Sequence, residues 1–524
     1  MSSTASINIP HLVVAGAEPW GHARPLCAFV ARVVLNRPVY VTLFTTPRVC
    51  ARVKTEISRW FGPEDAERHN LIRVVALDCL AEGASNFIEA LELEHQRYVA
   101  AFEDAYKLIM AARPVTCFET KVEVLAVPAP KVVVIDFMAG RLTHTIHKIS
   151  NAKAIAFACG MATFGYTFFA PSERSGRPNF KVKVLEEAAR TGRDPLEIAD
   201  DLGHTYTDDI IQNPGLPKMY HWENDPQQVG HMLKGILGGI WMGFADAYDS
   251  CDGMLITSPE VYEPHAIAAT KEWFAESSRS VWAIGPLAPA TTTEQAMSNE
   301  EAQSENSADI KKFLDSVLSK NGEHSAIYVS FGSGFWPSEL SKLETFVDVL
   351  LEKKVPFILS YGSPLAQLTD SFKERVGQSG LGLLSRWSPQ QTILSHQALG
   401  WFVTHAGHNS ILEALQSGVP MICWPFHADQ PANAVCLTEV HDVAYELLEV
   451  RTGNGLKPIL RTGKAPVNTS EALRAEVNEV LDKAFGDDGA QKRVNVKKLQ
   501  QKINSAWDKD GPAYVDMVRF LDTL

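Results

Sequence analysis

Short, mostly apolar runs alternate with longer helical segments along the whole chain, and this alternation restricts the possible folds more than any other feature. Clear examples are residues 11–16 (HLVVAG), 131–137 (KVVVIDF), 326–333 (AIYVSFGS) and 400–407 (GWFVTHAG). Strands of a parallel sheet that is covered by helices on both faces are apolar throughout, whereas half-exposed strands alternate apolar with polar residues. The pattern therefore predicts an α/β protein. A helix is expected over 26–35, and further strands are expected at 39–46, 154–160, 253–258, 282–289, 356–361, 382–387, 420–426 and 444–448.

One segment interrupts the alternation and predicts a domain boundary. Residues 290–309 (ATTTEQAMSNEEAQSENSAD) have almost no large apolar side chains, as in a solvated linker. A chain of 524 residues is also too long for one ordinary core. We expect two doubly wound domains, with a ligand cleft between them at the carboxyl ends of the strands. The expected divisions are an N-terminal domain 1–288, a linker 289–309, a C-terminal domain 310–505 and a final helix 506–524 that packs back on the first domain.

Composition argues against several classes of protein. The net charge is −13 and no basic stripe is visible, so nucleic acid and anionic membranes are not expected partners. No run of 18 apolar residues occurs, and the first ten residues lack the basic and apolar parts of a secretory signal. The eight cysteines are scattered without a CxxC pair. We therefore expect a cytoplasmic protein with neither disulfides nor a zinc site.

The hexapeptide HAGHNS (405–410) lies where a buried strand ends and a helix begins. Ser410 and Glu413 have the spacing of a capping box, which predicts Ser410 as the helix N-cap. The free N–H groups and positive dipole end of such a helix also suit a phosphate. Many helices begin in this way, so the hexapeptide alone leaves a simple cap and an anion site both open.

An ordered set of residues surrounds this hexapeptide over the 44 positions from Trp387 to Gln430. It comprises Trp387-Ser388-Pro389-Gln390, then His405, Gly407, Asn409, Ser410 and Glu413, then Gly418-Val419-Pro420, Pro425 and Asp429-Gln430. In residue type, order and spacing this set resembles the signature box of plant-type UDP-sugar-dependent glycosyltransferases. The segments AIYVSFGS, AIGPL and NPGLP are similar to further landmarks of that family, and the resemblance covers essentially the whole chain. It implies the GT-B fold, in which two Rossmann-like domains face each other across a cleft.

The resemblance also implies roles for the residues of the box. Trp387 would stack on uracil, Gln390 would bind the uridine and Glu413 would accept both ribose hydroxyls. The diphosphate would be bound by Ser333, His405, Asn409 and Ser410, beside the turn at Gly407, and the sugar hydroxyls by Asp429 and Gln430. In this family, glutamine at the last position of the signature box, here Gln430, usually accompanies a preference for glucose as the transferred sugar. This points to UDP-glucose as co-substrate. The family commonly has Cys-Gly-Trp where this chain has Ala406-Gly407-His408. His408 is therefore either a packing residue or an extra donor near the phosphates.

Two first-domain residues complete the expected chemistry. A lone histidine after a strand is more often structural, but Gly21-His22 lies in the first strand-to-helix turn and aligns with a Gly-His pair of the family. Asp136 ends an apolar strand, where a carboxylate without a partner would be costly. The resemblance implies that Asp136 orients His22, which removes the proton from an acceptor hydroxyl as it attacks the anomeric carbon. A single displacement would invert that carbon and give a β-glycoside. The family uses neither a metal nor a permanently bound cofactor.

The acceptor is expected to be a small lipophilic molecule with a hydroxyl group, such as a phenolic, flavonoid, terpenoid or sterol. The acceptor candidates are Trp20, Phe137, Met138 and Met161, although core packing explains each of them equally well. Residues 170–235 mix proline, glycine, aromatic and acidic residues, and we expect helical excursions and loops near the cleft there. We expect the protein to be a monomer.

Alternative functions remain open to different degrees. A nicotinamide dehydrogenase is disfavoured because AGAEPWGH lacks the GxGxxG fingerprint and the second strand ends in LFTTP without an acidic residue. A non-catalytic UDP-sugar binder is disfavoured by His22 and Asp136. The same chemistry with galactose, glucuronic acid, xylose or N-acetylglucosamine as the transferred sugar is a further alternative. A transmembrane glucuronosyltransferase is not expected, because no signal or anchor is visible.

Overall fold

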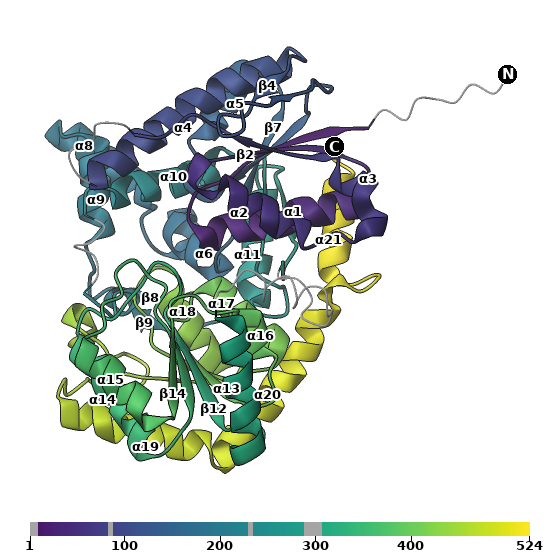
Figure 1. Ribbon diagram of the computed structural model, residues 1–524. Helices are drawn as coiled ribbons and strands as arrows, with labels where there is room; N and C mark the ends of the chain where they lie inside the picture. Colours follow the sequence, from purple (N-terminus) through teal and green to yellow (C-terminus); the bar gives the residue numbers. More distant parts are fainter. Residues whose placement is uncertain (1–8, 82–86, 229–233, 288–305) are drawn as a thin grey trace.

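The computed structural model describes residues 9–81, 87–228, 234–287 and 306–524, and in these ranges the chain forms two α/β lobes (Figure 1). Each lobe is built on a parallel sheet, with seven strands in the first lobe and six in the second among the described residues. The predicted α/β class with two Rossmann-like halves is therefore confirmed.

The first sheet has the strand order β3-β2-β1-β6-β7-β10-β11. Its strands are β1 (His11–Ala15), β2 (Tyr40–Thr45), β3 (Ile72–Ala76), β6 (Val132–Asp136), β7 (Lys153–Ala158), β10 (Gly253–Ile256) and β11 (Ser280–Ala283). Alternate residues of β1 pack into different cores: Leu12 and Val14 belong to one apolar cluster, Val13 and Ala15 to another. Because both faces are covered, the strand is apolar after the buried His11, and this apolar run is the property from which it was predicted.

The helices of the first lobe begin with α1, which follows β1 directly. They are α1 (Trp20–Asn36), α2 (Pro47–Ser58), α3 (Ala66–His69), α4 (Phe87–Met110), α5 (Leu142–Ile149), α6 (Ala162–Phe169), α7 (Ser172–Ser175), α8 (Phe180–Thr191), α9 (Pro195–Gly203), α10 (Leu237–Ser250) and α11 (Pro264–Ala275). Two short hairpins pair β4 (Val115–Thr116) with β5 (Glu123–Val124) and β8 (Ile210–Ile211) with β9 (Met219–Tyr220).

The second sheet has the order β14-β13-β12-β15-β16-β17. Its strands are β12 (Ala326–Ser330), β13 (Phe357–Ser360), β14 (Gly382–Ser385), β15 (Leu399–Thr404), β16 (Met421–Cys423) and β17 (Ala444–Glu446). Its helices are α13 (Ser307–Asn321), α14 (Leu340–Glu352), α15 (Asp370–Ser379), α16 (Gln390–Leu394), α17 (His408–Ser417), α18 (Gln430–Val435), α19 (Ser470–Ala484) and α20 (Asp487–Asn504).

The last helix, α21 (Pro512–Leu521), returns to the first lobe, and the yellow C-terminal segment runs along the side of the molecule in Figure 1. The carboxylate of Asp516 accepts a hydrogen bond from the Ala283 amide of β11 at 2.9 Å, and the Phe520 ring packs edge-on against Trp282. The described residues contain no helix whose length and apolarity would let it cross a bilayer.

Several local expectations differ from the structure. The strand β3 was not predicted, because only its last two residues are fully buried and its sequence includes Arg73. Ser410 is not the N-cap of α17. The helix begins at His408 with Gly407 as its N-cap, and no side chain caps it, because the Glu413 carboxylate is bound by other side chains. Most of the predicted linker, at 289–305, lies outside the described residues, and α13 already begins at Ser307.

Candidate active site

A cavity of about 660 Å³ lies between the two lobes and is lined by residues of both. Its walls come from loops that follow the carboxyl ends of strands, where doubly wound folds bind ligands. All ten residues predicted to bind the donor line this cavity: Ser333, Trp387, Gln390, His405, Gly407, Asn409, Ser410, Glu413, Asp429 and Gln430. His22 also lines it, whereas Asp136 is fully buried.

His22 and Asp136 form a hydrogen-bonded pair. Asp136 is the last residue of β6. The sequence had suggested that His22 lies in the turn before the first helix, but it lies in the first turn of α1 itself. Nδ1 of His22 lies 3.0 and 3.1 Å from the two carboxylate oxygens of Asp136. Since a carboxylate only accepts, Nδ1 carries the proton, and Nε2 is left with the lone pair.

Three neighbours contact this pair. The ring of Phe137 stacks on the His22 ring at a centroid distance of 5.3 Å, and the Met138 amide donates to Asp136 at 2.9 Å. The third neighbour, Cys159, directly follows β7, and its Sγ lies 3.2 Å from Nδ1 of His22. Burial, together with the nearby carboxylates, raises the pKa of the Cys159 thiol well above its usual range, so the sulfur is protonated.

The donor candidates of the second lobe follow four of its six strands. Ser333 comes after β12, Trp387 after β14, His405 after β15 and Asp429 after β16. Because these parallel strands are neighbours or near neighbours, their carboxyl ends bring the four loops to one edge of the sheet. Residues up to 96 positions apart in the chain are thus collected around one cavity by the strand order alone.

The ring of His405 is packed against glycine backbone. A Cβ on Gly407 would lie 2.3 Å from its Nε2, and one on Gly332, which has φ of +73°, would lie 2.7 Å from its Cε1. Burial lowers the pKa of His405 to about 4, so the ring is neutral at pH 7 and can still donate from one nitrogen. His408 is also buried, its pKa is lowered to about 4, and its ring lies 6.1 Å from that of Tyr262. His408 also lines the cavity, so a packing residue and an extra donor near the phosphates both remain interpretations of this departure from the family pattern.

The carboxylate of Glu413 is held by both lobes. It accepts a hydrogen bond from Gln390 Nε2 at 2.6 Å and from Gln391 Nε2 at 3.3 Å, and it forms an ion pair with Arg24 of α1. Arg24 also contacts Glu56 of α2 at 3.1 Å. The sequence had not indicated Arg24, although it stands two positions after His22 in the same segment.

Three more donor candidates make defined contacts. Asn409 donates to the Gly21 carbonyl at 2.6 Å, and Asp429 accepts from the Met161 amide at 3.2 Å. The amide oxygen of Gln430 accepts from the backbone of Phe426 at 2.9 Å, which leaves its NH₂ group free for other acceptors. Burial raises the pKa of Asp429 to about 6. Trp387 is 42% exposed, and the Arg52 guanidinium of the first lobe lies 4.4 Å from the centroid of its ring.

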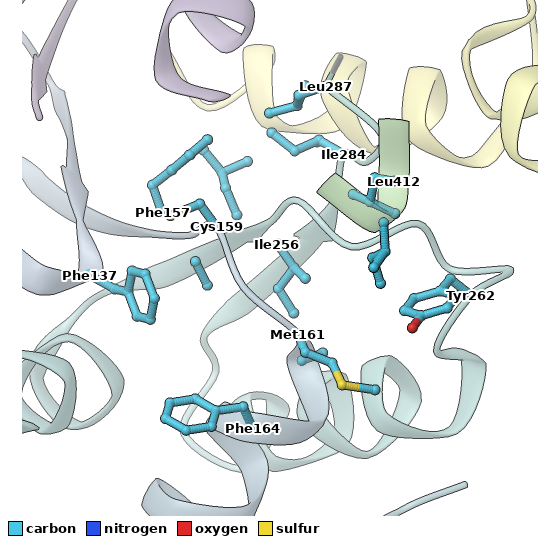
Figure 2. Packing of buried hydrophobic residues seen from close by; sticks show 14 of the residues in the cluster. Phe137, Phe157, Cys159, Met161, Phe164, Ile256, Tyr262, Ile284, Leu287 and Leu412 are labelled. Carbon is cyan, nitrogen blue, oxygen red and sulfur yellow. The ribbon is translucent and has the colours of Figure 1, made fainter. Parts of the chain in front are cut away.

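Part of the first-lobe side of the cavity is aromatic. Of the four acceptor candidates, Trp20, Phe137 and Met138 line it, whereas Met161 does not and has a buried side chain in the core (Figure 2). Phe137 stacks on Phe244 at a centroid distance of 4.3 Å. The wall is extended by residues that the sequence had not indicated, namely Phe164 of α6 and Trp241 and Phe244 of α10.

Comparisons with known proteins agree with this geometry. A family model described as "UDP-glucoronosyl and UDP-glucosyl transferase" matches residues 245–460. The UDP-glycosyltransferase eriJ of Hericium erinaceus is 31% identical over 529 residues, which cover 98% of each chain. The UDP-glycosyltransferase 73C5 of Arabidopsis thaliana is 26% identical, over 100% of this chain and 98% of its own.

A solved structure supports the same assignment at the level of the fold. The structure of Phytolacca americana UGT2 complexed with UDP-2fluoro-glucose and pterostilbene superposes with a TM-score of 0.67 at 18% identity and covers 99% of this chain and 100% of its own. The two lobes therefore have the GT-B fold. Together with the full-length match to the Hericium protein, this shows that the chain belongs to the UDP-glucuronosyl and UDP-glucosyl transferase family and is a UDP-glycosyltransferase.

Proposed function

We propose that the protein transfers glucose from UDP-glucose to a hydroxyl of a lipophilic small molecule and produces a β-glucoside. The observation that carries this proposal is the state of His22. Its Nδ1 is committed to Asp136, so Nε2 is available as a base in a cavity shared with all the donor candidates. A neutral imidazole positioned in this way is suited to remove the proton of an acceptor hydroxyl.

The proposed roles in the second lobe follow from chemical type and position. Trp387 offers an aromatic face to uracil, and Glu413 offers two carboxylate oxygens to the vicinal ribose hydroxyls. The charge of the departing UDP is met by hydrogen-bond donors, namely Ser333, His405, Asn409, Ser410 and the N-terminal amides of α17. Under this proposal the reaction needs neither a metal nor a permanently bound cofactor, because the protein itself supplies this stabilisation.

Two observations support a hexose such as glucose as the transferred sugar. Gln430 presents a free NH₂ group beside Asp429, so that one residue donates and the other accepts, as sugar hydroxyls require. The related Phytolacca structure contains UDP-2fluoro-glucose and the stilbene pterostilbene. The aromatic wall of Phe164, Trp241 and Phe244 favours an acceptor of similar flat, lipophilic character.

The proposal assigns different tasks to different parts of the chain. Residues 1–288 bind the acceptor and provide the base, residues 310–505 bind UDP-glucose, and the segment 506–524 joins the second part to the first. We also propose that the protein acts in the cytoplasm as a monomer. Eight buried free thiols support a reducing compartment.

A donor-by-acceptor screen with purified protein tests the proposal. UDP-glucose, UDP-galactose, UDP-glucuronic acid, UDP-xylose and UDP-N-acetylglucosamine are each paired with phenolic, flavonoid, terpenoid and sterol acceptors, and products are identified by mass. We expect hexosides from UDP-glucose with the β configuration by NMR. Preferred use of another donor, or an α-linked product, would contradict the proposal.

Variants separate the role of His22 from general effects of substitution. His22→Ala should abolish transfer while it leaves UDP affinity nearly intact. The matched control is His144→Ala, since this side chain of α5 is 60% exposed and does not line the cavity. Equal turnover by the His22→Ala variant would remove the base assignment.

A further inference from the structure

Cys159 joins the His22–Asp136 pair in a cluster that the transfer reaction does not require. Among the residues that the structure describes, these three form the one group of three or more histidine, cysteine and carboxylate side chains whose potential ligand atoms all lie within 4.8 Å of one another. Asp136 is the last residue of β6, and Cys159 directly follows the adjacent strand β7. His22 comes from the neighbouring helix α1. The topology of the sheet edge therefore fixes the cluster.

The separations within the cluster suit a tetrahedral metal ion. Nδ1 of His22 lies 3.0 Å from Asp136 Oδ1 and 3.2 Å from Cys159 Sγ, and Sγ lies 3.8 Å from Asp136 Oδ2. Zinc bonds of about 2.3 Å to sulfur and about 2.0–2.1 Å to nitrogen and oxygen, at tetrahedral angles, place ligand atoms about 3.3–3.6 Å apart. Shifts of a few tenths of an ångström would bring all three atoms into that range.

We propose that His22, Asp136 and Cys159 form an inhibitory site for a thiophilic divalent cation of the zinc type. A thiolate, an imidazole and a carboxylate are ligands that zinc accepts, and three protein ligands leave a fourth position open. Since His22 and Cys159 both line the cavity, we expect that position to be reached from it by water or by an acceptor hydroxyl. Mg²⁺ prefers oxygen ligands in octahedral geometry and is not expected to bind here.

Metal binding at this site blocks the base. The Cys159 thiol releases its proton to solvent as the metal–sulfur bond forms, and the charges of thiolate and carboxylate balance the 2+ charge of the ion. His22 must give its Nδ1 lone pair to the metal, so the imidazole proton moves from Nδ1 to Nε2. The nitrogen that would take the acceptor proton then already carries one. Binding follows from the cluster alone, whereas inhibition rests on the proposed role of His22.

The test measures metal binding apart from transfer. Co²⁺ is added to the full-length protein as a spectroscopic probe, Zn²⁺ binding is measured by equilibrium dialysis, and Cys159→Ser is compared with Cys251→Ser, a buried cysteine outside the cluster. We expect one high-affinity Zn²⁺ per chain, a thiolate-to-cobalt charge-transfer band, and loss of both in Cys159→Ser but not in Cys251→Ser. Affinity should fall at least about tenfold, since even outer-shell changes at metal sites have effects of that size.

A second ligand variant and the transfer assay complete the design. His22→Ala must also weaken Zn²⁺ binding by at least about tenfold, which protects the test if Cys159→Ser folds poorly. Zn²⁺, but not Mg²⁺, should inhibit glucosyl transfer by the wild-type protein, and EDTA should restore it. Unchanged Zn²⁺ affinity or an unchanged cobalt band in both ligand variants would overturn the site. If Zn²⁺ binds as expected but no sugar is transferred under any condition, the site stands and the proposed function fails.

Discussion

The substitution Asp136→Asn tests how the buried carboxylate acts on His22. Asparagine has nearly the same shape, and its amide oxygen can still accept the Met138 amide hydrogen bond, which is 2.9 Å long in the wild type. The amide NH₂ group then replaces the oxygen that lies 3.1 Å from Nδ1 of His22. The retained amide oxygen, 3.0 Å from Nδ1 in the wild type, is shared with the Met138 amide, whereas the NH₂ group can only donate to Nδ1. The substitution therefore shifts the imidazole towards the tautomer with its proton on Nε2. The ring stays in position but loses the lone pair needed for proton removal.

The expected loss of rate is large. General-base catalysis contributes about 10²–10⁴-fold, and the corresponding Asp→Asn change in a serine-protease triad lowers kcat about 10⁴-fold. We therefore expect kcat to fall about 10³–10⁴-fold, or about 4–5.5 kcal/mol in the activation free energy. The Kd for UDP should not change, since Asp136 is fully buried and does not line the cavity.

Steady-state transfer from UDP-glucose to an acceptor found in the screen measures kcat, and calorimetric titration measures the Kd for UDP. A thermal unfolding curve for each variant shows whether the fold is retained. The double variant His22→Ala/Asp136→Asn should be no slower than His22→Ala alone, because Asp136 acts through the imidazole. The reasoning is refuted if folded Asp136→Asn protein retains kcat within about tenfold of wild type, since loss of the base should cost at least about 10²-fold.

Other predictions address the donor and acceptor sides. Glu413→Ala should weaken UDP binding by about 1–3 kcal/mol in calorimetry, with folding retained because Arg24 keeps Glu56 as an ionic partner; an unchanged Kd would exclude the ribose role. UDP-glucose should exceed UDP-galactose in kcat/KM, and the reverse order would refute the interpretation of Gln430. Burial raises the folded-state pKa of Asp429 from 3.8 to about 6, so its ionisation destabilises the fold as pH rises between these two values, and the cost is constant above them. Asp429→Asn should therefore gain thermal stability relative to wild type as pH rises from about 4 to about 6, with a constant gain at higher pH, while it loses donor affinity. Trp241→Ala should raise KM for the acceptor more than KM for UDP-glucose, as the kinetics of both substrates would show.

The part of the fold that could be predicted was the part encoded by burial on both faces of a sheet. The runs around Val133 and Val329 were recognised as strands because parallel strands covered by helices carry few polar residues. The same rule failed for β3, an edge strand of the described sheet, where Ile72 and Arg73 are only partly buried. The capping prediction failed because a carboxylate three positions after a serine can serve a partner elsewhere, and Glu413 has such a partner in Arg24.

The site residues that lie close together in one sequence segment could be predicted. Their contacts with the other lobe could not. Asn409, Glu413 and Asp429 were found from their order in one segment, but each of them also contacts the first lobe, through the Gly21 carbonyl, Arg24 and the Met161 amide. Arg24 and Glu413 are 389 positions apart, so no local pattern could have paired them. Under the proposed function, ribose hydroxyls and Arg24 compete for one carboxylate. Donor binding must therefore rearrange contacts that hold the lobes together, and the affinity for UDP depends on both halves of the chain although the donor residues belong to one.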